Sequence, residues 1–318
     1  RSTQGVSSAA SDVYKRQVLF PGQGSQSVGM VKDLYENFDY IQDIFNEADN
    51  ALNFRLIKII FEGPKELLNE TENTQPAIFL ASYSIFSVIK KETSFDITKA
   101  NFFAGHSLGE YSAMACAEYL DFQDTIKILK VRGNAMQNSA PKGEGGMTAI
   151  LGVTVENIES IINANQANFR VEIANDNSEG QIVLSGKIED LDKLIIVLKE
   201  NTIKNIKLPV SAPFHCKLMN KATIVMDEEI SKLNFKETKN TLISNVTGKE
   251  ILNANNLKDL LVKQIENRVR WRESVLLMIN KGVSQFIEIG PGKVLSGLIK
   301  RIDKKVKVSA INTEEDIK

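Results

Sequence analysis

Short apolar runs along this chain alternate with longer segments of helical character. The runs at 18–20 and 100–104 are brief, apolar and bounded, as buried strands are. The segments near 31–48 and 76–91 are predicted as helices, and at about 124–136 apolar residues recur at helical spacing. Strands that alternate with helices in this way are typical of an α/β fold with a mainly parallel sheet.

This alternation changes at Gly143-Glu144-Gly145-Gly146, which is predicted to be a flexible joint. Beyond it the order becomes β-α-β-β-α-β, with strands at 147–153, 171–174, 181–185 and 206–210 and helices at 158–164 and 191–200. That is the ferredoxin-like order. We therefore expect a small ferredoxin-like α+β subdomain at 144–211, inserted into a large α/β catalytic subdomain made of 18–143 and 212–318, with the active site in the cleft between them.

Residues 1–17 are treated separately because they show no periodicity and lack the apolar core of a signal peptide. The stretch at 12–17 is similar to translated sequencing-adapter read-through. We expect a disordered leader that is foreign to the fold.

Composition narrows the class of protein. A chain of 318 residues that is 42% hydrophobic can bury a substantial core. Its 39 basic and 40 acidic residues nearly balance, which argues against a general nucleic-acid or membrane surface. The 2 cysteines cannot form a disulfide framework, no Cys/His cluster has metal-ligand spacing, and no apolar run is long enough to span a bilayer. The sequence therefore predicts a cytoplasmic protein without a metal site.

The segment Gly105-His106-Ser107-Leu108-Gly109 fits the pattern Gly-x-Ser-x-Gly and lies between the strand-like run at 100–104 and the helix formers at 110–117. A serine on such a sharp strand-to-helix turn exposes its hydroxyl, while the N–H groups that open the helix point toward a developing oxyanion. Ser107 is therefore a candidate nucleophile for acyl transfer. A glycine-rich turn without a catalytic role is the alternative, since the pattern is common.

A serine nucleophile needs a base, and the chain has only 2 histidines, His106 and His215. His106 directly precedes Ser107, so its side chain is expected to shape the pocket. His215 lies in a proline-marked loop that leaves a strand, a usual setting for catalytic residues. We predict that His215 is the base; the alternative is a histidine that caps the next helix.

These segments, taken together with others, resemble the malonyl-CoA:acyl carrier protein transacylases of fatty acid synthesis and the related acyltransferase domains of polyketide synthases. The resemblance runs from about residue 19 to about residue 312. Its motifs occur in the family's order: Phe20-Pro21-Gly22-Gln23-Gly24-Ser25-Gln26, Asn73-Thr74-Gln75-Pro76-Ala77, the Ser107 segment, Val131-Arg132-Gly133, Ala212-Pro213-Phe214-His215, Val269-Arg270-Trp271 and Glu288-Ile289-Gly290-Pro291-Gly292. The resemblance implies that the large subdomain is α/β-hydrolase-like.

The resemblance also implies roles for residues around the serine. The backbone N–H groups of Gln23 and Leu108 would form the oxyanion hole. Arg132 would bind the malonyl carboxylate, because a guanidinium matches a carboxylate with two hydrogen bonds; without the resemblance, an exposed arginine on an amphipathic helix is the default reading. Phe214 would form the pocket wall beside the substrate α-carbon and favour malonyl over methylmalonyl.

Further positions follow from the same resemblance. The backbone carbonyl of Gln264 would orient His215, so no carboxylate is needed as a third member. Asn175 and Asn177 would line the cleft, although a turn role is nearly as plausible. Arg268 stands where many relatives carry proline, which leaves the local loop conformation open.

The implied reaction is a ping-pong transfer of malonyl from malonyl-CoA, through a malonyl-serine ester, to the phosphopantetheine thiol of acyl carrier protein. No cofactor is expected, since coenzyme A is part of a substrate and phosphopantetheine is carried by the partner. The enzyme is expected to be a monomer. Because carrier proteins are generally acidic, a basic patch is expected to receive them, with these candidates: Lys204, Lys207, Lys217, Lys300 and Arg301.

Three other functions remain in view. A serine esterase would share the turn but should have an acidic residue between serine and histidine in the chain order. A discrete polyketide acyltransferase would share all the site residues. A noncatalytic binding module is disfavoured because every catalytic position of the pattern is filled. The glycines around Gln23 lack the Gly-Lys-Ser/Thr part of a phosphate-binding loop, which argues against nucleotide hydrolysis.

Overall fold

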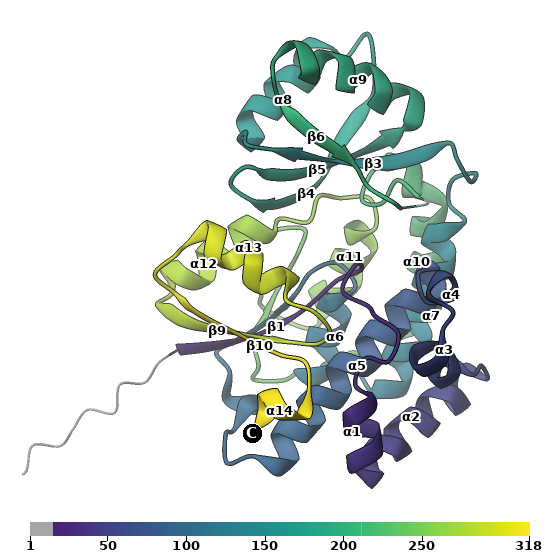
Figure 1. Ribbon diagram of the computed structural model, residues 1–318, viewed down its shortest axis with the longest axis vertical. Coiled ribbons are helices and arrows are strands. Elements are labelled where there is room, and N and C mark those ends of the chain that lie inside the picture. Colours follow the sequence, from purple (N-terminus) through teal and green to yellow (C-terminus); the bar gives the residue numbers. More distant parts are fainter. Residues whose placement is uncertain (1–14, 211) are drawn as a thin grey trace, which may run out of the picture.

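The computed structural model describes residues 15–210 and 212–318, which fold into a large α/β part and a small part above it (Figure 1). The large part is built on a six-stranded sheet in the order β10-β9-β1-β2-β7-β8. All neighbours pair in parallel except β7 and β8, which are antiparallel. The strands are β1 (Lys15–Phe20), β2 (Phe102–Gly105), β7 (Leu242–Ile243), β8 (Glu250–Ile251), β9 (Val283–Ile289) and β10 (Lys307–Ile311).

Helices cover both faces of this sheet. Val18 and Phe20 of β1 belong to the large cluster on one face, and Leu19 between them belongs to a second cluster on the other. Side chains alternate across a strand, so a central strand that is covered on both sides is apolar throughout. The main helices are α2 (Asp39–Leu52), α5 (Thr71–Glu92), α6 (Gly109–Cys116), α7 (Phe122–Gln137), α10 (Asn220–Ser231), α11 (Asn255–Gln264), α12 (Trp271–Asn280) and α13 (Val294–Ile302).

Short helices complete the large part: α1 (Lys32–Asn37), α3 (Leu56–Glu62), α4 (Lys65–Leu68), α14 (Glu314–Ile317) and the 3-10 turns Ile97–Lys99 and Lys217–Met219. Two helix boundaries differ from expectation. The helix expected at 31–48 is two helices, because Phe38 adopts an extended conformation (φ −132°) between α1 and α2. The helix expected from residue 76 begins at Thr71, so Pro76 lies inside α5.

The small part has the β-α-β-β-α-β order that the sequence predicts. Its four-stranded antiparallel sheet has the order β4-β5-β3-β6. The elements are β3 (Gly145–Leu151), α8 (Val155–Ala164), β4 (Val171–Ser178), β5 (Gln181–Lys187), α9 (Ile188–Glu200) and β6 (Lys204–Lys207). The predicted fold class, a mainly parallel α/β sheet with an inserted α+β unit, is confirmed.

The segment around Val269 ties the small part to the large part. Its N–H donates to the carbonyl of Ala174 at 2.8 Å, and its carbonyl accepts from Asp176 N–H at 2.9 Å. Arg272 at the start of α12 forms an ion pair with the fully buried Asp176 at 2.9 Å. Through these backbone bonds, Val269 of the large part pairs in parallel with β4 of the small part. The ion pair between Arg272 and Asp176 joins the two parts at the same position.

The expected leader is wrong at its C-terminal end. Lys15, Arg16 and Gln17 are part of β1; all three pair with β9, and Gln17 also pairs with Phe102 of β2. The physical reason is that β9 (Val283–Ile289) is long enough to pair with three residues before the apolar run at 18–20. The rest of the predicted leader, 1–14, lies outside the described residues.

Gln17 is fully buried in β1, and neither polar atom of its side-chain amide has a hydrogen-bond partner in the described chain. Burying an amide without partners costs about 1 to 3 kcal/mol. Gln17→Leu should therefore raise the free energy of unfolding by about that amount, measured from the urea midpoint. Gln166→Leu, at an exposed position of the small part, should change stability by less than about 0.5 kcal/mol. A Gln17→Leu protein no more stable than wild type would contradict the expectation.

Across residues 15–210 and 212–318, no helix combines the length and apolar character needed to cross a membrane.

Candidate active site

Ser107 lies on the turn between β2 and α6 with a left-handed backbone (φ 54°). Such a conformation is strained for a residue other than glycine. The flanking glycines allow the crossing elements to approach closely: a Cβ atom on Gly105 would lie 1.9 Å from the carbonyl oxygen of Gly109, and one on Gly109 would lie 2.2 Å from that of Phe20. The predicted strand-to-helix turn is therefore present, and its glycines cannot be replaced without moving backbone.

The side chain of Asn245, in the loop after β7, forms two hydrogen bonds with the backbone of this turn. Its Oδ1 accepts from the Ser107 N–H at 2.7 Å, and its Nδ2 donates to the Gly105 carbonyl at 2.7 Å. Two bonds from one amide fix the backbone on both sides of His106. Sequence reasoning missed Asn245, because nothing local to the segment around it indicates that it reaches a turn 138 positions away.

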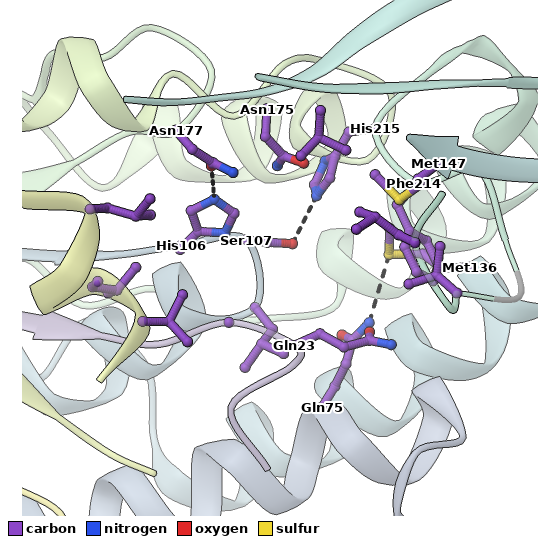
Figure 2. A pocket seen from close by; sticks show the side chains of 18 of the residues that line it. Gln23, Gln75, His106, Ser107, Met136, Met147, Asn175, Asn177, Phe214 and His215 are labelled. Carbon is purple, nitrogen blue, oxygen red and sulfur yellow. Dashed lines mark hydrogen bonds between the residues drawn. The ribbon is translucent and has the colours of Figure 1, made fainter. Parts of the chain in front are cut away.

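The structure brings Ser107 and His215 together. His215 Nε2 lies 2.8 Å from Ser107 Oγ (Figure 2). Its Nδ1 lies 2.8 Å from the backbone carbonyl of Gln264. A carbonyl only accepts, so Nδ1 carries the proton and Nε2 is left to accept one from the serine. His215 also has a left-handed backbone (φ 59°), and the loop before it is held by the Ser185 hydroxyl, which donates to the Phe214 carbonyl.

Burial, and secondly the positive charge of Arg132, lower the pKa of His215 to about 3, although the bond to the Gln264 carbonyl acts in the opposite direction. The unprotonated form is the one that can accept a proton. A lowered pKa therefore keeps His215 competent as a base at pH values where a free histidine, with a pKa of about 6.5, would be protonated.

We expect the His215 ring to stay neutral as the pH falls from about 8 to about 5, a range in which an ordinary histidine titrates. NMR of protein with isotope-labelled histidine would measure this, since His106 is the only other histidine and burial lowers its pKa as well. In urea both rings should titrate near 6.5. A His215 signal with a midpoint near 6.5 in the folded protein would show that its environment is more polar than described.

Arg132 of α7 is 1% exposed, and its guanidinium reaches Ser107. Its Nη1 donates to Gln75 Oε1 at 2.7 Å, and its Nη2 donates to Gln264 Oε1 at 2.8 Å and to Ser107 Oγ at 3.2 Å. In the described chain its Nε–H has no acceptor, and no carboxylate forms an ion pair with the guanidinium. A buried guanidinium without an ion-pair partner among the described residues, with Nη2 3.2 Å from the serine oxygen, is suited to bind an anionic substrate group.

Gly133, the neighbour of Arg132, explains how α7 comes so close to α5. A Cβ atom at this position would lie 2.5 Å from the Thr71 carbonyl oxygen at the start of α5. The close approach brings Gln75 of α5 within hydrogen-bond distance of Arg132. The motif Asn73-Thr74-Gln75-Pro76-Ala77 gives Gln75 no individual role, so its contact with the guanidinium is a second site feature that sequence reasoning missed.

Gln23 and Leu108 line the pocket at the serine. Over the described ranges, neither backbone N–H donates to a protein acceptor, and that of Leu108 stands at the N-terminus of α6. In the described chain, two residues with unpaired N–H donors therefore line the pocket at the serine. Their assignment as the oxyanion hole stays a prediction.

The other expected pocket residues, His106, Asn175, Asn177 and Phe214, also line the pocket. His106 Nε2 is 2.8 Å from Asn177 Oδ1, and the His106 ring packs against Trp271 with centroids 5.7 Å apart. Asn175 on β4 and Phe214 both line the pocket. Figure 2 shows Asn175 and Asn177 above the serine and Phe214 to one side.

The pocket has a volume of about 190 Å³ and lies between the two parts. Its floor is formed by the turn with Ser107, its roof by strands of the small part, and one apolar side by Leu295 and Leu298 of α13. In the described ranges no cluster of three or more His, Cys, Asp or Glu side chains could hold a metal ion.

Several charged residues named from the sequence are engaged elsewhere. Lys217 pairs with Glu266 at 3.0 Å, and Lys207 pairs with Asp192. Arg268 pairs with Glu159 of α8, so its side chain joins the small part to the loop before Val269. The expected basic patch stays a prediction.

Attack by a serine on a thioester is chemistry that this arrangement suits, because base, nucleophile and unpaired donors meet in one buried pocket. Fold and site together define an acyltransferase. The model of the acyl transferase domain matches residues 18–314, and the chain belongs to that family. No carboxylate contacts His215 in the described chain, which argues against the triad of an esterase.

The names of individual relatives are more specific than the name of the family, because they specify malonyl transfer. The malonyl CoA-acyl carrier protein transacylase of Bacillus subtilis strain 168 is 40% identical over 301 residues, 94% of each chain. An acyl-carrier-protein-S-malonyltransferase from Bartonella henselae superposes with a TM-score of 0.91 at 39% identity, covering 95% of this chain and 96% of that one. A malonyl-transacylase solved with its type II PKS acyl-carrier protein gives a TM-score of 0.91 at 36% identity, covering 95% and 97%. The family resemblance that the motifs predict is confirmed.

Proposed function

We propose that the protein transfers the malonyl group from malonyl-CoA to the phosphopantetheine thiol of acyl carrier protein, which supplies fatty acid elongation. The observation that carries the proposal is Arg132: a buried guanidinium without an ion pair in the described chain, 3.2 Å from Ser107 Oγ. A carboxylate at the far end of a malonyl group would satisfy that charge while its thioester carbon lies at the serine.

In the first half-reaction, His215 Nε2 accepts the Ser107 proton as Oγ bonds to the thioester carbon. The carbonyl oxygen becomes an oxyanion, which the N–H groups of Gln23 and Leu108 stabilise. The intermediate collapses, the carbon–sulfur bond breaks, and His215 returns the proton to the sulfur. Coenzyme A leaves as a thiol and a malonyl-serine ester remains.

In the second half-reaction, the carrier's thiol gives its proton to His215 and its sulfur attacks the ester carbon. The bond to Ser107 Oγ breaks, and the proton passes from His215 back to Oγ. The reaction needs no cofactor, because coenzyme A and phosphopantetheine belong to the two substrates. The remaining pocket residues position the acyl group: Phe214 beside the α-carbon, and His106, Asn175 and Asn177 along the cleft.

Intact-protein mass spectrometry tests this function. Mixing with malonyl-CoA should give one malonyl adduct, and holo carrier protein should remove it and become malonylated. Carrier protein without phosphopantetheine should leave the adduct in place. An adduct lost to water at the same rate with either carrier would indicate an esterase and overturn the proposal.

A second candidate is malonyl supply to a polyketide carrier. It is favoured by the malonyl-transacylase that was solved with a type II PKS acyl-carrier protein and shares this fold at 36% identity. Comparing kcat/KM for carriers of the two kinds would decide between them, with at least about a tenfold preference expected for the physiological one.

We further propose that the enzyme works as a monomer in the cytoplasm. The support for a monomer is that contacts within this chain bring Ser107, His215 and Arg132 together. Light scattering at assay concentration should give the mass of a single chain, and a dimer would contradict the monomeric state.

A further inference from the structure

A carboxyl group lies beneath the serine and has no part in the reaction described above. Glu110 of α6 is 1% exposed. Its Oε2 accepts from Gln264 Nε2 at 2.5 Å and from the Asn245 backbone N–H at 3.3 Å. Both partners also hold the nucleophile or the base, so Glu110 contacts the residues that set the geometry of the site.

The side-chain amide of Gln264 connects this carboxyl group with the arginine. Its Nε2 donates to Glu110 and also to the Ser107 carbonyl at 3.0 Å, while its Oε1 accepts from Arg132 Nη2 at 2.8 Å. With the amide turned over, its N–H groups would face the guanidinium, which only donates, and its oxygen would face the carboxylate, which only accepts. A carboxylate at Glu110 therefore selects one orientation of the amide.

The Gln264 amide lies between Glu110 and Arg132, and this affects how Arg132 can bind a substrate carboxylate. A carboxylate in direct contact with Arg132 would occupy the donors that a substrate carboxylate needs. Glu110 lies one side chain further away, and no carboxylate of the described chain pairs directly with the guanidinium. Its negative charge lies near Arg132 without forming an ion pair with it.

We propose that Glu110 is a positioning residue: through the Gln264 amide it orients the Arg132 guanidinium toward the substrate carboxylate, and so sets the preference for carboxylated acyl groups. This inference rests on the proposed malonyl transfer. Burial raises the pKa of Glu110 to about 7, opposed by its hydrogen bonds to Gln264 and Asn245 and by the charge of Arg132. The other ionisable group beside it, Tyr111, has a pKa raised to about 12 by burial. At pH 8 Glu110 is therefore mainly the carboxylate.

The test is Glu110→Gln, which keeps the shape but presents both a donor and an acceptor to Gln264. At pH 8, kcat/KM for malonyl-CoA should fall about 10- to 100-fold, as expected when a hydrogen bond to a charged group is replaced by one to a neutral amide that no longer selects the orientation of Gln264. For acetyl-CoA, which has no carboxylate for Arg132, kcat/KM should change less than about threefold. In an Arg132→Ala background, Glu110→Gln should have no further effect on the ratio of the two substrates.

Glu288→Gln is the matched control. Glu288 is a fully buried carboxyl group that accepts from the N–H groups of Leu295 and Ser296, away from the arginine. Its loss should lower stability without changing the malonyl-to-acetyl ratio. If Glu110→Gln does not fold, Gln264→Met removes the same connection and keeps the backbone carbonyl that His215 needs, and the ratio should fall in the same way.

Equal losses for both acyl groups in Glu110→Gln would overturn the inference and reduce Glu110 to a structural role. An unchanged ratio in a folded Gln264→Met protein would do the same. Failure of the proposed function is distinguishable, because wild-type enzyme would then either form no malonyl adduct or lose the adduct to water instead of passing it to holo carrier protein.

Discussion

Replacing Ser107 with alanine should abolish the malonyl-enzyme, with kcat falling about 10⁴-fold or more. The hydroxyl lies 2.8 Å from the ring nitrogen of His215 and 3.2 Å from the arginine, and among the described residues no other serine, threonine or cysteine lines the pocket. Intact-protein mass spectrometry after mixing with malonyl-CoA is the measurement. Ser112→Ala, which removes a buried hydroxyl on the same helix α6, should leave the adduct unchanged.

His215→Ala should act differently, because it removes the base and keeps the nucleophile. The adduct should still form, about 10²- to 10⁴-fold more slowly, as expected for loss of general base catalysis. Rapid quenching at several times would give the rate. An adduct that persists in Ser107→Ala would remove the central assignment, whereas a normal rate in His215→Ala would remove only the role of the base.

Replacing Arg132 with alanine should lower kcat/KM for malonyl-CoA, while acetyl transfer falls far less or rises. Removing one partner of a desolvated, hydrogen-bonded charge pair typically costs about 2 to 5 kcal/mol, which corresponds to roughly 30- to several-thousand-fold in rate. An acetyl group has no carboxylate and so never makes that interaction. The measurement is kcat/KM for both thioesters with wild type and variant.

Two further variants sharpen that experiment. Arg132→Lys should restore only part of the malonyl activity, because an ammonium keeps the charge but cannot donate to Gln75, Gln264 and a carboxylate in the geometry of a guanidinium. Lys127→Ala, at an exposed position of the same helix α7, should leave both substrates unaffected. If Arg132→Ala reduces both substrates equally, the arginine supports the fold or a general step rather than the carboxylate.

Local patterns predicted much of this fold because each depends on neighbours in the chain. The apolar runs became β1 and β2, and the β-α-β-β-α-β order of the inserted part appears as predicted. The predicted end of the leader was wrong at Lys15 to Gln17, because polar residues entered a strand whose partners come from distant segments. Composition alone cannot reveal such pairing.

The site was predictable where chemistry requires a particular residue type, as for Ser107 and His215. It was less predictable where a residue acts through distant backbone. Asn245 reaches the Gly105 carbonyl across 140 positions, and Glu110 meets Gln264 across 154 positions. Amides and carboxylates of this kind are common on surfaces, so their burial beneath the serine is a property of the assembled fold.

The bonds of Val269 with β4, together with the pair of Arg272 and Asp176, bear on the timing of the reaction. They anchor the roof of the pocket to its floor beside β4. Under the proposed function, coenzyme A and the carrier's phosphopantetheine arm bring their thiols to this same pocket of about 190 Å³. We therefore expect coenzyme A to leave before the carrier's arm enters, which is the order of a ping-pong transfer.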